Sequence, residues 1–188
     1  MITVTHPAAK AVVAAVHKAA TAVLRKVAPN APVRPYGMHP LAWQTYLAAG
    51  LSPSRVGQTI GSALASAGTH AKDGEYMGHD YAADTDYRIG DLTTDAEVRA
   101  FLTKLWSMGL GAYYRANGQD HWPGVRHVHG FFPGCPMKEI CRHQVHDFLH
   151  NPMENGLASH ADYHFAQPTE AQCQPIRAAF LAHNPMNN

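Results

Sequence analysis

Two stretches of the chain carry side chains that could bind a metal ion. Residues 78–89 contain His79 and, seven positions later, Asp86, and residues 127–129 read His-Val-His. An imidazole, a carboxylate and a further imidazole would give a zinc ion three protein ligands and leave one position open. Catalytic zinc sites have this arrangement, whereas structural sites are usually closed by four ligands, often cysteines. The pattern therefore predicts a metal-dependent hydrolase.

The spacing of the His-x-His pair also predicts how its members divide the chemistry. Alternate side chains of a strand point the same way, so His127 and His129 would face a neighbouring strand that carries Asp86. If His129 binds the metal, His127 would lie beside a water or an incoming carbonyl, as a base or as a stabiliser of the oxyanion. Zinc lowers the pKa of a bound water from about 15.7 toward roughly 7. The expected reaction is hydrolysis of an amide.

The elements that must position these residues follow from hydrophobic periodicity and from turn signals. Helices are predicted over residues 7–27, 41–49, 53–68, 95–108, 137–150 and 170–181, with capping boxes at Thr94 and Thr169. Strands are predicted over 81–89, 111–116 and 125–132, the last two antiparallel neighbours, and 69–81 is predicted to be a loop. Helices segregated from a few strands indicate an α+β fold with a small, mainly antiparallel sheet flanked by helices.

These residues carry a resemblance to a known group of zinc peptidases. His79, Asp86 and the His-x-His resemble the signature of lysostaphin-type enzymes, D-alanyl-D-alanine carboxypeptidases and the hedgehog amino-terminal domain. The glycine-aromatic run 109–114 resembles the carboxypeptidase-like branch, and the likeness spans roughly residues 60–135. The resemblance implies a hedgehog/D,D-peptidase-like fold, one zinc ion held by His79, Asp86 and His129, and His127 as the catalytic histidine. It further implies a peptide substrate, most often a peptidoglycan stem peptide or cross-bridge.

The first ligand has an alternative in the sequence. The group usually has a serine two positions before its first histidine, and here that position is Met77. Residues 68–70, Gly-Thr-His, also resemble the approach of small residues to the first ligand. A loop insertion after this point would make His70 the ligand and His79 its neighbour.

Other side chains near the signature are candidates for supporting roles. Three positions before the last ligand, where the carboxypeptidase branch often has a glutamate, the chain has Arg126, so the base would be His127 or a side chain such as Asp120. Asp84 replaces the usual alanine and is predicted to be either a solvated carboxylate or one behind the ligands, rather than a ligand itself. Trp122 is predicted either to face the substrate or, more commonly for a loop tryptophan, to cover an edge of the core.

Two further functional hypotheses stand beside the peptidase. The hedgehog likeness allows a non-catalytic, metal-containing binding domain of the same fold. Residues 146–150, His-Asp-Phe-Leu-His, resemble the helical His-Glu-x-x-His of another zinc peptidase class, with His146 and His150 on one face. Aspartate reaches less far than glutamate, however, and the Asn-Pro at 151–152 ends the helix at once, so an exposed helix face is the alternative.

Composition limits the remaining possibilities. With 188 residues and 46% hydrophobic content the chain can bury one sizeable core. Residues 1–36 are predicted to be an N-terminal helix and a proline-rich connector packed on the domain, and residues 37–188 a single metallopeptidase-like domain. Fifteen basic and fourteen acidic residues give a net charge of +1, so nucleic acid is not an expected partner. No run reaches the length of a membrane span.

The cysteines and the absence of a recognisable targeting signal give little information on disulfides or on cellular location. Cys135, Cys141 and Cys173 are odd in number and form no Cys-x-x-Cys pair, so no disulfide framework is expected, although a bridge between Cys135 and Cys141 stays open. The sequence shows no signal peptide and gives no address. A cell-wall-facing or phage-associated protein follows only from the family resemblance.

Overall fold

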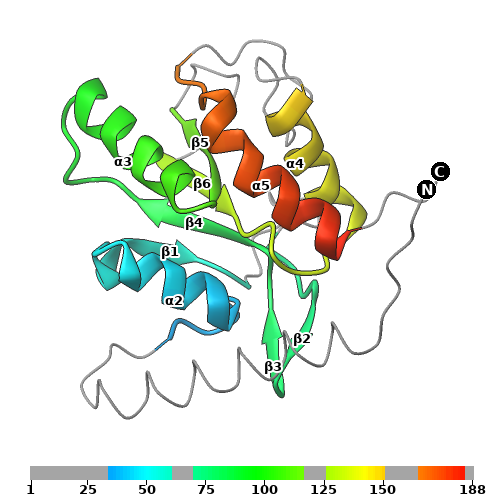
Figure 1. The fold of residues 1–188 in the computed structure, drawn as a ribbon. Coiled ribbons are helices and arrows are strands. Elements are labelled where there is room, and N and C mark those ends of the chain that lie inside the picture. Colours follow the sequence, from blue (N-terminus) through cyan, green and yellow to red (C-terminus); the bar gives the residue numbers. More distant parts are fainter. Residues whose placement is uncertain (1–33, 61–69, 117–125, 151–164, 185–188) are drawn as a thin grey trace. The chain divides into compact units, whose positions relative to one another are not determined.

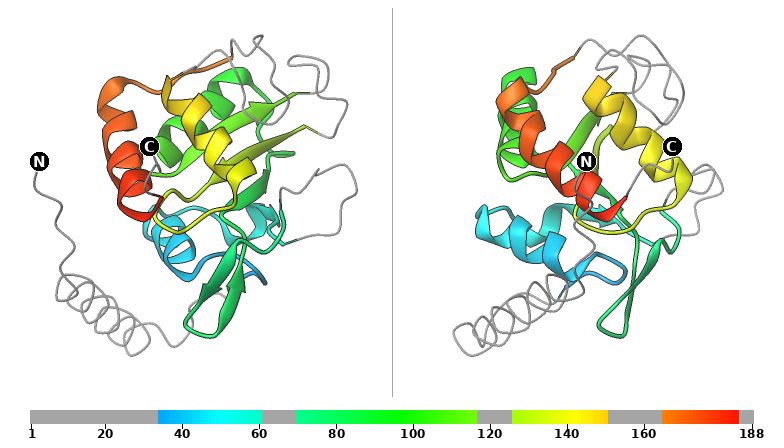
Figure 2. Two further views of the ribbon diagram at one scale, coloured as in Figure 1. Left: turned by 90° about the vertical axis from the view of Figure 1, so that its right-hand side faces the viewer. Right: turned by 45° about the vertical axis from the view of Figure 1, so that its right-hand side comes forward.

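A four-stranded antiparallel sheet organises the part of the chain that the structure describes. In this computed structural model, residues 34–60, 70–116, 126–150 and 165–184 are described, and residues 34–188 form one compact unit. The strands are β1 (Val56–Gln58), β4 (Asp84–Arg88), β6 (His127–Phe131) and β5 (Gly111–Arg115), in that order across the sheet (Figure 1). A separate hairpin, β2 (Gly74–Tyr76) and β3 (His79–Tyr81), projects beyond this sheet (Figure 2).

Helices pack on both faces of the four-stranded sheet. They are α2 (Pro40–Ala48), α3 (Asp95–Ser107), α4 (Glu139–His150) and α5 (Glu170–His183). Tyr87 of β4 stacks on Tyr46 of α2, with ring centroids 5.2 Å apart, and meets Phe101 of α3 at 5.8 Å. On the opposite face Phe148 of α4 lies 5.3 Å from Phe131 and 5.4 Å from Tyr113. The α+β prediction with a small, mainly antiparallel sheet is confirmed at this level.

Caps fix the ends of the two helices with the strongest sequence signals. The Thr94 side chain accepts the Glu97 amide while the Glu97 side chain accepts the Thr94 amide, and Thr169 and Gln172 make the same pair at α5. Each box satisfies amide donors that the first helical turn cannot pair internally. Gly109, with φ of 76°, follows α3 in the left-handed region where a side chain would be strained. The helices predicted from residues 41, 95, 137 and 170 are therefore confirmed.

Three predicted elements differ in the structure. Residues 53–58 form a three-residue 3-10 helix and then β1, because Val56–Gln58 pair with β4 and Ser52 makes no side-chain cap. The predicted loop over 69–81 contains the β2–β3 hairpin, whose turn residues Met77 and Gly78 have φ of 53° and 76°. The strand predicted over 81–89 is interrupted after Tyr81, the end of β3, and resumes at the start of β4. The helix predicted over 7–27 lies outside the described residues.

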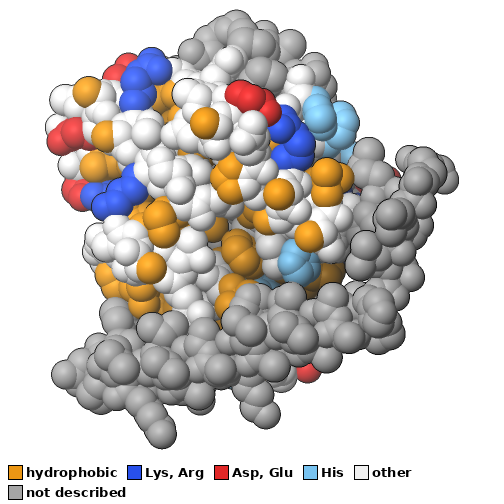
Figure 3. Space-filling view, in the orientation of Figure 1, with side chains coloured by type: hydrophobic (Ala, Val, Ile, Leu, Met, Phe, Trp, Pro, Cys, Tyr) orange, Lys and Arg blue, Asp and Glu red, His pale blue; other side chains and the backbone are white. Residues whose placement is uncertain are grey.

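The surface mixes side-chain types, and the cysteines are unpaired in disulfide terms. On the face drawn in Figure 3, charged side chains of both signs are interspersed with hydrophobic and uncharged ones. No helix among the described residues has the length and apolar character needed to cross a membrane. Cys135, Cys141 and Cys173 are all buried free thiols, so the structure contains no bridge between the first two.

Candidate metal centre

Strand register brings Asp86 and His129 together. They are directly opposite each other on β4 and β6, so their side chains share one face of the sheet. Nδ1 of His129 lies 2.8 Å from Oδ1 of Asp86. His129 is almost fully buried, and Asp86 retains 21% exposure of its side chain. Two of the predicted ligands therefore lie in contact although 43 residues separate them.

His70 is the third member of this group. Its Nε2 lies 3.2 Å from Oδ2 of Asp86, and its ring is 5.2 Å from the His129 ring. Nδ1 of His70 lies 3.0 Å from the carbonyl oxygen of Thr59. Because a carbonyl oxygen can only accept a hydrogen bond, Nδ1 is the donor. In the neutral ring this leaves the Nε2 lone pair directed at Asp86, as a metal ligand requires. The backbone at His70 has φ of 51° and its amide donates to Asp84 Oδ2 at 2.7 Å.

Gln144 of α4 orients His129 from the other side. Its Oε1 lies 2.9 Å from Nε2 of His129, and the glutamine is fully buried. Since an amide oxygen accepts, Nε2 carries a proton, and in the neutral ring Nδ1 then presents its lone pair toward Asp86. Sequence reasoning did not identify Gln144. Its signal was only a polar residue on the apolar stripe of a predicted helix.

The donor set and its spacing suit a metal ion. Nitrogen atoms of His70 and His129 and a carboxylate oxygen of Asp86 all lie within 4.8 Å of one another. Two ligand atoms at 2.0–2.1 Å from a tetrahedral zinc are about 3.3 Å apart, close to the 3.2 and 2.8 Å separations here. Two imidazoles and one carboxylate are hard-to-borderline donors that zinc and iron(II) both accept. These three residues could therefore hold a metal ion.

No family model, curated protein or solved structure matches this chain. A function for this chain is therefore inferred from the geometry of the described residues and from the sequence resemblance.

The structure does not bring His79 into the group. His79 is exposed on β3 and pairs with Tyr76 across the hairpin. The β2–β3 hairpin occupies the segment between His70 and β4, which is the insertion that the sequence alternative required. Contrary to the prediction for His79, the histidine that joins Asp86 and His129 in the structure is therefore His70.

His127 lies beside the three donors, in the position that its spacing predicts. Its Nε2 is 3.7 Å from Oδ1 of Asp86, and its side chain is 16% exposed. It shares the face of β6 with His129 because two positions separate them. An accessible imidazole next to a carboxylate can hold or deliver a proton.

The charges of the group reinforce one another. Burial opposes ionisation of Asp86, but hydrogen bonds to His129 and His70 hold the pKa of this carboxyl well below its ordinary range. Burial also disfavours the charged form of His70. This effect of burial is outweighed by the hydrogen bond to Asp86 and by the negative charges of Asp84 and Asp86. The pKa of His70 is therefore raised. Without a metal, the cluster is thus a carboxylate shared between imidazoles.

The other residues that the sequence singled out lie behind the group, outside the described residues, or on α4. Asp84 is fully buried beside His70, with Oδ2 3.5 Å from Nδ1, so it is not a solvated carboxylate and lies behind the candidate donors. Asp120 and Trp122 lie outside the described residues. His146 and His150 do share a helix face, with ring centroids 4.7 Å apart. Within the described ranges no third metal donor joins them.

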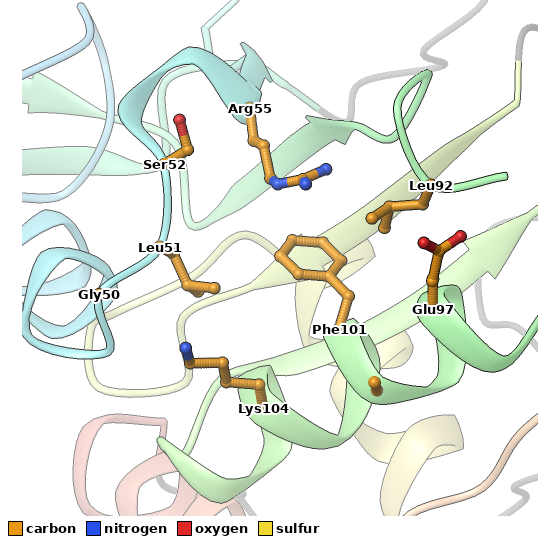
Figure 4. A pocket seen from close by; sticks show the side chains of 9 residues that line it. Gly50, Leu51, Ser52, Arg55, Leu92, Glu97, Phe101 and Lys104 are labelled. Carbon is orange, nitrogen blue, oxygen red and sulfur yellow. The ribbon is translucent and has the colours of Figure 1, made fainter. Parts of the chain in front are cut away.

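A hollow of about 410 Å³ lies elsewhere, between the end of α2 and α3 (Figure 4). The Arg55 guanidinium stands over the Phe101 ring at 5.3 Å and forms an ion pair of 2.5 Å with Asp91. The residues that line this hollow include neither the three candidate metal donors nor His127. The hollow is therefore separate from the candidate metal centre.

Proposed function

We propose that the protein is a zinc-dependent peptidase that hydrolyses an amide bond in a small peptide. The observation that supports this best is the convergence of His70, Asp86 and His129, with His127 beside them on the same strand face. Three protein ligands are the number that catalytic zinc sites use. The substrate class, a peptidoglycan stem peptide or cross-bridge, comes from the sequence resemblance.

The protein's own residues have distinct roles in this proposal. The ion would be held by His70, Asp86 and His129. The Thr59 carbonyl orients the ring of His70, and Gln144 orients the ring of His129. A zinc ion supplies Lewis acidity, which polarises a carbonyl and lowers the pKa of water to about 7. The orienting contacts matter because partners behind the ligands commonly change metal affinity by about 10–100-fold.

His127 is the proposed general base. It is partly exposed, and Asp86 lies 3.7 Å away to stabilise its protonated form. Arg126, which replaces the glutamate of the carboxypeptidase branch, donates to Tyr114 Oη at 2.7 Å and to the Ile89 carbonyl at 3.3 Å. A guanidinium held in this way cannot accept a proton at neutral pH. The proton would therefore pass from water to His127 and then to the leaving amine.

Metal analysis of the purified protein tests the ligands. We expect His70→Ala and His129→Ala each to lose one equivalent of bound metal relative to wild type, while His79→Ala, an exposed control, keeps it. Identification of the metal distinguishes zinc from iron(II). Metal retained in His129→Ala but lost in His146→Ala would contradict this site and support the helical one.

Digestion of muropeptides tests catalysis. His127→Ala should retain the metal and lose at least about 100-fold in kcat/KM, the usual contribution of a general base. If wild-type protein binds zinc at this site but leaves muropeptides intact at every pH, the non-catalytic metal-binding domain is the better description.

A further inference from the structure

A second group of potential ligands lies behind the first. Asp73, Asp84 and Cys141 each place a carboxylate oxygen or sulfur within 4.8 Å of the other two. They come from three segments: the residue before β2, the first residue of β4, and the third residue of α4. Asp84 and Cys141 are fully buried, and Asp73 is partly buried.

The Asp73 carboxylate is held in place by the backbone. Its Oδ1 accepts the Lys138 amide at 2.7 Å, and its Oδ2 accepts the Ala83 amide at 2.7 Å. The Cys141 sulfur lies 3.9 Å from Oδ2. Each carboxylate oxygen has two lone pairs, so Oδ1 retains one for a further partner, whereas the second lone pair of Oδ2 accepts the Cys141 thiol until that thiol loses its proton. The orientation of Asp73 is therefore fixed before any ligand binds.

Asp84 carries an oxygen with no partner. Its Oδ2 accepts the His70 amide at 2.7 Å, whereas its fully buried Oδ1 has no hydrogen-bond partner among the described residues. A buried acceptor without a partner costs about 1–3 kcal/mol, and more when it is charged. No lysine or arginine side chain in the described part of the chain forms an ion pair with Asp73 or Asp84. The charged or titratable groups nearest the two carboxylates are Lys138, which acts on Asp73, and His70, 3.5 Å from Asp84. The group therefore has one unused oxygen.

We propose that Asp73, Asp84 and Cys141 bind a second divalent cation, of the zinc-like class that accepts both thiolate and carboxylate ligands. A thiolate favours zinc, cobalt(II) or cadmium over magnesium and calcium, which take oxygen ligands. Binding would replace the thiol proton of Cys141, which leaves to solvent, and would give Asp84 Oδ1 a partner. Since the donors come from three segments, the ion would join the approach to β2, the sheet and α4.

The two sites are adjacent but have separate donors. His70 lies between them, with Nε2 3.2 Å from Asp86 and Nδ1 3.5 Å from Asp84. The second site does not depend on the proposed peptidase function. Variants of Cys141 and of His129 can therefore test the two sites separately.

Cobalt(II) titration of the reduced, metal-free full chain tests the second site. We expect a thiolate-to-cobalt charge-transfer band in the near ultraviolet that saturates by two equivalents, because the first site also takes up cobalt. Cys141→Ser should abolish the band, while Cys135→Ser and Cys173→Ser, at two other buried thiols, should keep it. His129→Ala should also keep it, because that residue belongs to the first site.

Two results would overturn the second site: wild-type protein that shows no band at saturating cobalt, or a band that persists in Cys141→Ser. Far-ultraviolet circular dichroism verifies that each variant, His129→Ala included, is folded. If Cys141→Ser does not fold, Asp84→Asn is tested instead. We expect this variant to raise the Kd of the cobalt ion that produces the charge-transfer band at least tenfold. An unchanged Kd in that variant counts against the site.

Discussion

Asp86 contacts three imidazoles, and this single carboxylate defines the candidate centre. Its oxygens lie 2.8 Å from His129, 3.2 Å from His70 and 3.7 Å from His127. The first two rings each have their distal nitrogen occupied, by Gln144 and by the Thr59 carbonyl. Hydrogen bonds at the far side of a ring fix which nitrogen faces the metal. At the scale of residues, the centre is therefore oriented for a ligand before one binds.

Gln144→Leu should weaken metal binding by about 10–100-fold, because Nε2 of His129 loses the oxygen that fixes its proton. The Kd for zinc, measured by competition with a chromophoric chelator, checks this. Arg142→Ala, an exposed position on the same helix, is the matched control and should leave the Kd unchanged. Equal affinities for Gln144→Leu and wild type would show that the contact does not orient the ligand.

At the scale of elements, the β2–β3 hairpin separates His70 from β4. It has a two-residue turn in which both central residues, Met77 and Gly78, have positive φ. Turns of this kind favour Asn-Gly, because asparagine tolerates the left-handed region better than methionine does. Met77 is also 58% exposed, so its side chain contributes little packing.

Met77→Asn should therefore raise the free energy of unfolding by about 0.5–1 kcal/mol. Chemical denaturation monitored by circular dichroism measures the change. Met108→Asn is the control, since Met108 is exposed but has φ of −94°. The turn assignment would be contradicted if both variants changed stability equally.

The capping box of α3 gives a second prediction at this scale. Thr94→Ala removes the side chain that accepts the Glu97 amide and should cost about 1 kcal/mol of stability. Thr103→Ala, an exposed threonine in the interior of the same helix, should have a much smaller effect. Urea midpoints of the two variants provide the comparison. A Thr94→Ala midpoint equal to that of wild type would mean that the cap does not stabilise the helix.

At the scale of the whole molecule, the centre joins segments that are distant in sequence. His70 precedes the hairpin, Asp86 and His129 lie on neighbouring strands, and Gln144 belongs to a helix on that face. A ligand that binds only the folded state stabilises it by RT ln(1 + [L]/Kd), about 4 kcal/mol at 1,000 times Kd. Metal binding should therefore raise the stability of the entire unit.

This stabilisation should depend on pH with a definite sign. In the metal-free protein the raised pKa of His70 adds stability below about pH 6.5, the unfolded value, and that contribution is lost as pH rises through the folded pKa. Metal requires the neutral ring, so protons compete with it at low pH. The difference in Tm between zinc-loaded and chelator-treated protein should grow from about pH 5 to about pH 8. A difference that is constant over this range would contradict the role of His70.

Much of the scaffold could be predicted from local sequence patterns. The capping boxes at Thr94 and Thr169 mark where two helices begin, since a cap depends only on residues three positions apart. Alternation along β6 places His127 and His129 on the same face of their strand, and alternation along β4 fixes the face that carries Asp86. The sequence alone therefore determined the donor types and the strands that carry two of the three candidate donors.

Non-local contacts decided the rest. His70 and His79 are both histidines upstream of β4, and only the tertiary structure directs His70 into the sheet face while the hairpin carries His79 away. The local signal at Ser52-Pro53 predicts a helix over β1, whereas the pairing of β1 with β4 involves residues some thirty positions away. Gln144 reaches His129 only because α4 packs on that face. Periodicity fixes which face a side chain occupies, but the folding back of distant segments determines which faces meet.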